Sequence, residues 1–275
     1  MEEFFAHAPV LIPILIALGL AAGFMAGLLG IGGGAVLVPG LFFLFQTLGY
    51  PEDSLMHLSV GTSLAIIIPT GMSSALAHFK RGAVRVDLLK LIGPGIVAGV
   101  MVGIYIADFL SGHELTLVFG CALISFAALM QIPARVCEDA SHEIGLARGS
   151  VGGFAVGALS SLMGIGGATL NVPFMTLNGV GIRNAVATAS ALGPFIALPG
   201  TFGFIAIGWE EAALPPFSLG YINLLSAALI APLSVLAAPY GAATAHKVSV
   251  TALRRIFSVF IVLVAAKMMW GALHG

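Results

Sequence analysis

Charged side chains are scarce in this chain, and the scarcity excludes most soluble folds. Only 8% of the 275 residues are charged, whereas 59% are hydrophobic. A soluble domain carries about 25% charged residues, so this chain lacks the polar surface that a water-soluble fold of its length needs. Nearly uncharged runs at residues 115–130 and 222–240 have lengths suited to membrane spans. The composition predicts an all-α polytopic membrane protein, with the lipid bilayer as its surroundings.

Basic excess and cysteine pairs are missing as well. The formal net charge of −1 argues against a basic lipid-binding face and gives no indication of a nucleic-acid partner. Two cysteines, Cys121 and Cys137, fit no metal-ligand spacing, and we interpret both as structural. The chain begins with Met1-Glu2-Glu3, which is acidic where a signal peptide would be basic, so we expect no cleaved segment. We expect no cofactor and no metal.

A glycine-rich segment is present twice. The sequence LGIGGG at residues 29–34 recurs 134 residues later as MGIGGA, and a proline, Pro39 or Pro173, follows each copy at the same distance. Two weaker matches extend the repeat: residues 59–63 with 185–189, and Gly103-x3-Ala107 with Gly241-x3-Ala245. Glycine-broken apolar segments at matching positions of two halves are typical of transporter binding sites.

The repeat divides the chain into a first membrane half at residues 1–132, a linker at 133–147 and a second membrane half at 148–275. Five apolar segments are predicted in each half, near residues 10–30, 34–48, 58–78, 90–110 and 115–132, and near 148–164, 168–180, 185–207, 218–240 and 251–272. The second segment of each half is shorter than the ~20 residues that a straight crossing needs. Tilted and partial crossings both remain open for these two segments.

Loop charges predict opposite orientations for the two halves. Lys80, Arg81, Arg85 and Lys90 cluster near one loop, which the positive-inside rule places in the cytoplasm. The matching loop, near Trp209, contains no lysine or arginine and is expected outside. Each half then contains an odd number of crossings. We therefore predict inverted repeats, a cytoplasmic linker and two outer termini.

The glycine breaks are predicted to form a small-anion site where the two halves meet near the membrane midplane. Non-helical backbone is tolerated at membrane depth only where it is buried in protein or lines a watery cavity. The helices that start after the breaks direct unpaired N–H groups at the gap, and their dipoles favour an anion there. The candidate substrate-binding residues are Gly32, Gly33, Gly34, Gly166, Gly167, Ala168, Thr169, Asn171, Thr62, Ser63 and Thr188.

Not every glycine or polar residue is expected to bind a ligand. Glycines spaced four residues apart, Gly19 with Gly23 and Gly153 with Gly157, are expected to allow close helix packing. Serine and threonine hydroxyls in membrane helices usually bond to their own backbone. For the hydroxyl residues of the third segments, such bonding is the alternative to ligand binding. His57 and His78 stand at segment ends and are expected at the membrane interface.

Catalytic patterns are absent from the sequence, which contains no HExxH, no G-x-S-x-G and no aspartate pair inside a segment. We therefore expect no enzyme activity. No carboxylate falls well inside a predicted segment, although proton-coupled transporters often place one there. An interior-negative potential supplies ~2.3 kcal/mol per charge per 100 mV, which favours anion efflux driven by the potential. An anion channel remains an alternative.

The paired segments at residues 27–39 and 161–173 resemble the signature of the sulfite exporter TauE/SafE family, and residues 214–223 fit it too. The resemblance implies a secondary transporter, usually an exporter, of small sulfur-containing anions such as sulfonates or sulfite in the bacterial cell inner membrane. Import of small carboxylates or sulfur oxyanions is its alternative, and a homo-oligomer is left open. Ala168 replaces the glycine that matches Gly34, and Ala189 stands where Ser63 does, so the two half-sites are expected to differ.

Overall fold

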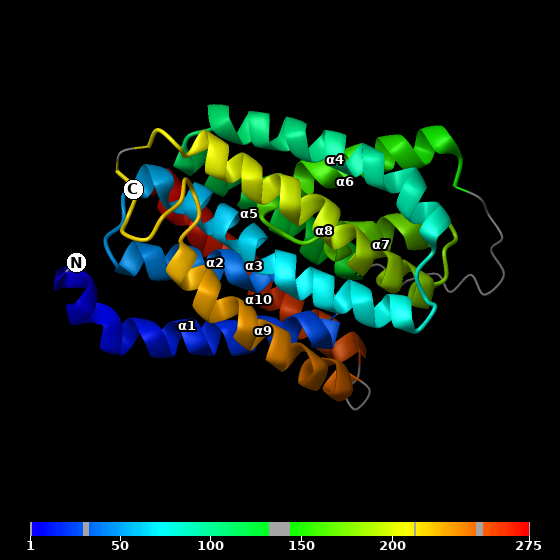
Figure 1. The fold of residues 1–275 in the computed structure, drawn as a ribbon, viewed down its shortest axis with the longest axis horizontal. Helices are drawn as coiled ribbons and strands as arrows, with labels where there is room; N and C mark the ends of the chain where they lie inside the picture. The colour runs from blue at the N-terminus through cyan, green and yellow to red at the C-terminus, as the bar shows by residue number, and fades with distance from the viewer. Residues whose placement is uncertain (1, 30–32, 132–143, 212, 246–249, 275) are drawn as a thin grey trace.

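The computed structural model describes residues 2–29, 33–131, 144–211, 213–245 and 250–274. Over these residues the chain forms ten α-helices and no extended strand (Figure 1). They are α1 (Glu2–Leu29), α2 (Gly34–Thr47), α3 (Glu52–Lys80), α4 (Val86–Phe109), α5 (Gly112–Gln131), α6 (Leu146–Met163), α7 (Ala168–Leu177), α8 (Ile182–Ile207), α9 (Leu224–Ala245) and α10 (Val250–His274). Gly32, Cys137 and most of the predicted linker lie outside the described residues.

The ten predicted apolar segments each coincide with one helix, which confirms the all-α fold class. The ninth prediction had the wrong start, because α9 begins at Leu224 rather than near residue 218. Residues 217–223 form a tight turn instead, in which Phe217 and Gly220 adopt positive φ values of 63° and 53°. A single bridge between Ser218 and Asn223 closes this turn. An α-helix cannot pass through such dihedral angles.

Seven helices in the described part of the chain are long and apolar enough to cross a membrane. These spans are Leu11–Leu28 in α1, all of α3, α4, α5 and α8, Leu224–Gly241 in α9 and Arg255–His274 in α10. The helices after the glycine breaks, α2 and α7, have only 14 and 10 residues. A 10-residue helix is about 15 Å long, half of a ~30 Å hydrocarbon core.

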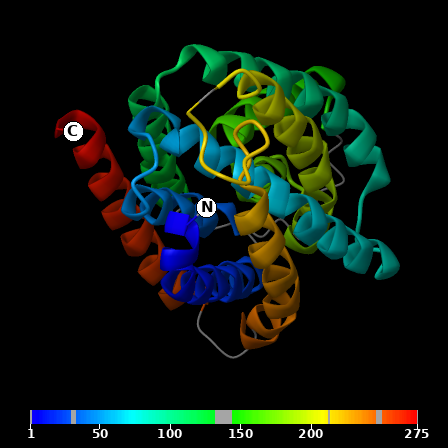
Figure 2. The same ribbon diagram turned by 60° about the vertical axis from the view of Figure 1, so that its left-hand side comes forward.

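Helix packing follows the internal repeat. The first half contributes α1 to α5, and α6 to α10 follow in the same order in the second half. The main contacts are α1 with α9 and α4 with α6. Because α6 is the counterpart of α1 and α4 is the counterpart of α9, these two contacts are equivalent in the repeat. The other large contacts, α3 with α8 and α5 with α10, each join a helix to its own counterpart. Figures 1 and 2 both show α1 lying along α9.

The spaced glycines lie in the contacts between helices, which confirms their expected packing role. A Cβ on Gly19 or Gly23 would meet the backbone of α9. Their counterparts, Gly153 and Gly157, face the backbone of α4 at Ile92 and Ile96 in the same way. Small residues at such points let two helix backbones approach closely, which membranes favour.

The third matched pair, Gly103 and Gly241, makes equivalent contacts too. A Cβ on Gly103 would lie 2.6 Å from the carbonyl oxygen of Ala158. A Cβ on Gly241 would overlap the carbonyl oxygen of Phe24, and Phe24 precedes Ala158 by the same 134 residues that separate the two glycine breaks. The sequence repeat is therefore also a repeat of packing contacts.

Candidate functional site

The first break ends at Gly33, which precedes α2 and has a φ of 68°. Only glycine adopts this left-handed region without steric cost. The Gly33 carbonyl accepts hydrogen bonds from the N–H groups of Val36 and Leu37, at 3.0 and 2.9 Å. Gly33 and Gly34 are both buried, so the start of α2 lies inside the protein.

The second break joins α6 to α7 through a short turn. Gly164 ends α6 with a φ of 59°, and the next N–H, of Ile165, donates to the Ser160 carbonyl at 3.1 Å. This pairing is the usual way in which a glycine terminates a helix. The new helix begins at Ala168, directly after Gly167, and the Asn171 N–H donates to the Gly167 carbonyl at 2.8 Å.

The two breaks contact each other. A Cβ on Gly34 would lie 2.7 Å from the Gly164 carbonyl oxygen and 2.8 Å from the Cα of Ile165. The Ser63 hydroxyl, from α3, donates a hydrogen bond to the same Gly164 carbonyl at 2.8 Å. Segments that are far apart in the sequence therefore meet at one point.

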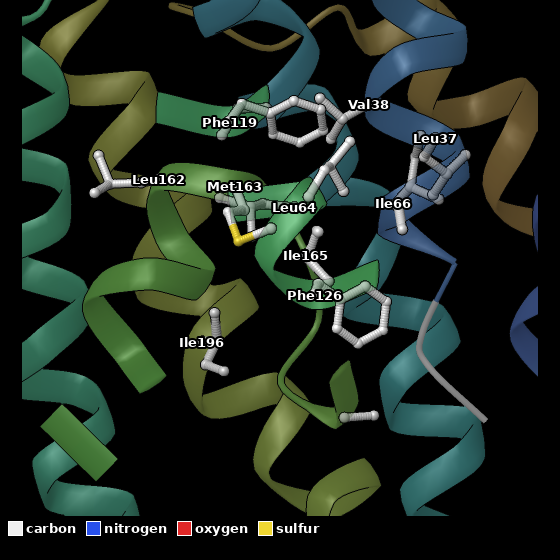
Figure 3. Close-up of a cluster of buried hydrophobic side chains, with 14 of the residues drawn as sticks. Leu37, Val38, Leu64, Ile66, Phe119, Phe126, Leu162, Met163, Ile165 and Ile196 are labelled. Carbon is white, nitrogen blue, oxygen red and sulfur yellow. The ribbon is translucent and has the colours of Figure 1, made fainter. Parts of the chain in front are cut away.

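Apolar side chains surround this meeting point. Figure 3 shows Ile165 of the second break in the middle of a cluster to which several helices contribute. Ile165, Leu64 and Ile196 have no exposed surface, and Leu37 is nearly as buried. The breaks are therefore enclosed by protein, as non-helical backbone at membrane depth requires.

Asn171 is the exceptional residue of the site. Its side chain has no exposed surface, and neither its Nδ2 nor its Oδ1 atom has a hydrogen-bond partner. The amide lies beside the second break, since a Cβ on Gly167 would be 2.6 Å from Asn171 Nδ2. Leaving a buried polar group unpaired costs about 1–3 kcal/mol, and such groups call for a functional explanation.

A second unpaired group, the Ser160 hydroxyl, lies one turn before the break and is also fully buried. Sequence reasoning singled out Asn171 but missed Ser160. The sequence spacing could have indicated Ser160, because it precedes Gly164 by about one helical turn and so lies on the same side of α6 as the break. Thr169 and Ala168 are buried in the first turn of α7, close to Asn171 in the chain.

Thr62 and Thr188 each bind another element. The Thr62 Oγ1 atom accepts a hydrogen bond from the Asn223 N–H at 2.9 Å, just before α9. The Thr188 Oγ1 atom accepts one from the Arg85 N–H at 3.0 Å, just before α4. The bonds are counterparts in the two halves, since α4 corresponds to α9. Among the three hydroxyl residues predicted for the site on α3 and α8, the structure brings Ser63 to the breaks, whereas Thr62 and Thr188 bind the residues just before α9 and α4.

Comparison with known proteins agrees with the paired breaks. Residues 15–268 match the family described as "Sulfite exporter TauE/SafE". The chain belongs to the TauE/SafE family. It is 33% identical to a "Probable membrane transporter protein" of Haemophilus influenzae, over 88% of this chain and 92% of the relative. It is 30% identical to "Probable membrane transporter protein YunE" of Bacillus subtilis, over the same two shares. No solved structure matches.

This TauE/SafE chain is thus a multi-pass membrane transporter, on the basis of its family, its relatives and its seven candidate spans. Within the described residues, no group of three His, Cys, Asp or Glu side chains could hold a metal ion. The chemistry offered by the breaks is hydrogen bonding from neutral groups. The Asn171 amide and the Ser160 hydroxyl are the groups described there that are both buried and unpaired.

Proposed function

We propose that this protein is a secondary transporter that exports small sulfur-containing anions, such as sulfonates or sulfite, across the bacterial inner membrane. The observation that carries the proposal is the buried, unpaired Asn171 amide beside the start of α7. A helix start attracts negative charge through its unpaired N–H groups and its dipole. A buried amide next to it provides a further neutral donor for the same anion.

The chemistry of a sulfonate suits such a site. A sulfonate has three oxygens that accept hydrogen bonds and is only weakly basic. Backbone N–H groups at the starts of α2 and α7, together with Asn171 and Ser160, provide neutral donors for these oxygens. Neutral donors bind such an anion reversibly, because no tightly paired cation has to be separated when the anion leaves.

Alternating access is supported by the exchanged packing of the two halves. In Figure 1, α3 runs from left to right, whereas its counterpart α8 runs from right to left. Two equivalent contacts, Thr62 with Asn223 and Thr188 with Arg85, join α3 to the start of α9 and α8 to the start of α4. We infer that the two halves form an inverted repeat. If one of the two contacts breaks while the other is kept, the site opens to one side of the membrane at a time.

Export is favoured by the membrane potential. An interior-negative potential drives an anion outward with ~2.3 kcal/mol per charge per 100 mV. The groups that enclose the breaks are apolar side chains and neutral polar groups, so the transported charge is that of the anion itself.

Flux into proteoliposomes under an imposed potential tests the proposal, with labelled sulfoacetate and labelled sulfite as probes. Asn171→Leu removes the amide and keeps a similar volume, so it is expected to reduce flux by about tenfold or more. The variant should unfold at the same or a higher temperature, since an unpaired buried group is lost. The first half already has leucine at the equivalent position, Leu37.

Asn178→Leu is the matched control. Asn178 ends α7, and its amide already donates to the Phe174 carbonyl at 2.7 Å, so its loss should affect stability rather than flux. The carrier is supported if flux is saturable, follows the potential and shows counterflow. Only Asn171→Leu, and not the control, should then lose this flux. Equal flux in wild type and Asn171→Leu would overturn the site, and flux without saturation or counterflow would indicate a channel.

A further inference from the structure

A cavity of about 200 Å³ lies at one end of the molecule, away from the glycine breaks. It is lined by Asp53, His57, Asp108, Leu110, Ser111, Gly112 and Tyr221. These residues come from the start of α3, the end of α4, the loop between α4 and α5, the start of α5 and the loop between α8 and α9. The two loops among them belong to the end of the molecule that the charge pattern predicts to be outside.

His57 is the unusual member of this cavity. Sequence reasoning expected it at the membrane interface, but its side chain is only 4% exposed. Its Nε2 atom is 2.9 Å from the Ala107 carbonyl oxygen. A carbonyl can only accept a hydrogen bond, so Nε2 carries the hydrogen in the neutral ring. The Nδ1 atom then has a free lone pair, and it is buried without a partner.

The carboxylates around His57 favour a positive charge on the ring, whereas its burial opposes one. Asp53 of α3 and Asp108 of α4 line the cavity with it, and Glu211 of the α8–α9 loop acts on it from further away. From α5, the Glu114 carboxylate accepts hydrogen bonds from the N–H and the hydroxyl of Ser111. No lysine or arginine is among the described residues that line the cavity.

Tyr221 completes this environment. Burial raises the pKa of its hydroxyl, and the carboxylates of Glu211 and Asp108 raise it further, so the hydroxyl stays neutral at physiological pH. Its ring lies 4.9 Å from the His57 ring, centre to centre. Among the described residues that line the cavity, His57 is thus the one whose side chain can gain a positive charge.

We propose that His57, with Asp53 and Asp108, forms a proton-binding site that opens to the outer side of the membrane. The proton binds to Nδ1, and the resulting imidazolium is balanced by the two carboxylates. A metal ion is the poorer alternative, because no three His, Cys, Asp or Glu side chains in the described chain, those of this cavity included, are placed so that they could hold one. A proton needs only the one lone pair that His57 offers.

Proton binding at this site would act on the contact between α3 and the α8–α9 loop. A Cβ on Gly61 would overlap the Tyr221 carbonyl oxygen, and Thr62 next to it binds the Asn223 N–H. His57 is on the same helix, one turn before Gly61, with its ring against Tyr221. We infer that the outer pH controls opening of this end. This consequence rests on the proposed carrier, whereas the proton site itself does not.

The site can be tested without substrate through the fluorescence of Trp209. Gly208, the preceding residue, packs against the Tyr221 ring, so the indole reports on the loop that contacts His57. Trp270→Phe removes the other tryptophan. The emission of Trp209 is expected to change with a single midpoint as the pH is lowered. His57→Gln should abolish the change, because glutamine can still donate to Ala107 but takes up no proton.

Two further variants sharpen the test. Asp108→Asn removes a carboxylate that stabilises the imidazolium, so the midpoint should move to lower pH. His78→Gln, at the opposite end of α3, should leave the titration unchanged. A wild-type signal that does not change with pH, or a titration that survives His57→Gln, would overturn the proton site. If His57→Gln does not fold, the titration is followed instead by nitrogen NMR of labelled histidines. The proposal is then overturned if Asp108→Asn shifts the midpoint of no histidine resonance.

The consequence for transport is measured separately, as flux at varied outer pH with inner pH and potential held constant. Flux that follows the fluorescence midpoint in wild type, and is independent of outer pH in His57→Gln, supports outer gating. A fluorescence titration with unchanged flux would retain the proton site and overturn its control of transport. Absence of any sulfonate or sulfite flux at every pH would instead count against the proposed function.

Discussion

Five buried polar side chains, predicted for the site or found beside it, fall into two groups, those with partners and those without. Ser63, Thr62 and Thr188 each make a hydrogen bond to a distant backbone group. Asn171 and Ser160 are equally buried but make none. A paired group stabilises the fold, whereas an unpaired one weakens it. The second group is therefore where a ligand would restore the missing hydrogen bonds.

Ser63 and Ser59 test the value of a bond between distant segments. Both are fully buried on α3, but Ser63 binds the Gly164 carbonyl, whereas Ser59 binds Leu55 within its own helix. Ser63→Ala should lower the free energy of unfolding by about 1 kcal/mol. Ser59→Ala should change it by less, because the Leu55 carbonyl keeps its place in the helix. Denaturant unfolding in detergent compares the two, and equal losses would contradict the structural role of Ser63.

At the residue level, the sequence signal for the site was polarity that interrupts an apolar segment next to glycine. That signal pointed to Thr169 and Asn171, both of which are buried after the second break. It did not distinguish Ser63 from Thr62, although they are neighbours. Adjacent residues on a helix point about 100° apart, so only the packing of α3 determines which hydroxyl reaches the break.

At the scale of helices, glycine determines how closely neighbours approach. The α4–α6 contact is built on Gly99 and Gly103 from α4 and on Gly153 and Gly157 from α6, each of which would place a Cβ against the opposite backbone. Because both sides of the contact are small residues, the helices have no room to adjust by a side-chain rotation. This contact and its counterpart, α1 with α9, are the most extensive contacts between the halves in the described chain.

Gly157→Val tests this contact. A Cβ at Gly157 would overlap the backbone of Ile96, so α4 and α6 would have to separate, at a cost of about 1–3 kcal/mol or more. The unfolding temperature in detergent should fall by several degrees. Gly271→Val is the control, because a Cβ at Gly271 meets nothing within 4 Å. Equal unfolding temperatures for the two variants would show that α4 and α6 tolerate separation.

At the scale of the whole molecule, the ends of the chain and the loops sort to two sides. In Figure 1, α1 begins and α10 ends at the left, together with the α8–α9 loop, whereas the loop between α3 and α4 is at the right. The charge pattern predicts that the left end faces outward. The same assignment places the His57 cavity on the outer side.

Labelling of single cysteines with a membrane-impermeant maleimide tests the orientation, in a background of Cys121→Ser and Cys137→Ser. Glu210→Cys, in the α8–α9 loop, should react in intact cells. Lys80→Cys, at the end of α3, should react only in inside-out vesicles. Both side chains are exposed, so lack of reaction reports the side of the membrane. The reverse pattern would invert the predicted topology.

The sequence by itself determined the class of the protein, the ten helices and the position of both breaks. These follow from local properties, namely apolar length, charge, and glycine at fixed places in two copies. Loop geometry was less predictable, as the late start of α9 shows. That start depends on a turn whose Phe217 has a positive φ, a conformation that non-glycine residues seldom adopt.

Only the tertiary structure decided which polar groups are left without partners. His57 resembles an interfacial residue in the sequence, yet α4 and the α8–α9 loop bury it and leave one nitrogen unpaired. In the sequence, Asn171 resembles any polar residue near a helix start, and only the structure shows that neither of its amide atoms has a hydrogen-bond partner. Whether a polar atom is paired depends on contacts between segments that are up to 215 residues apart. A sequence pattern records residue types and spacing, and it contains no information about such contacts until the chain has folded.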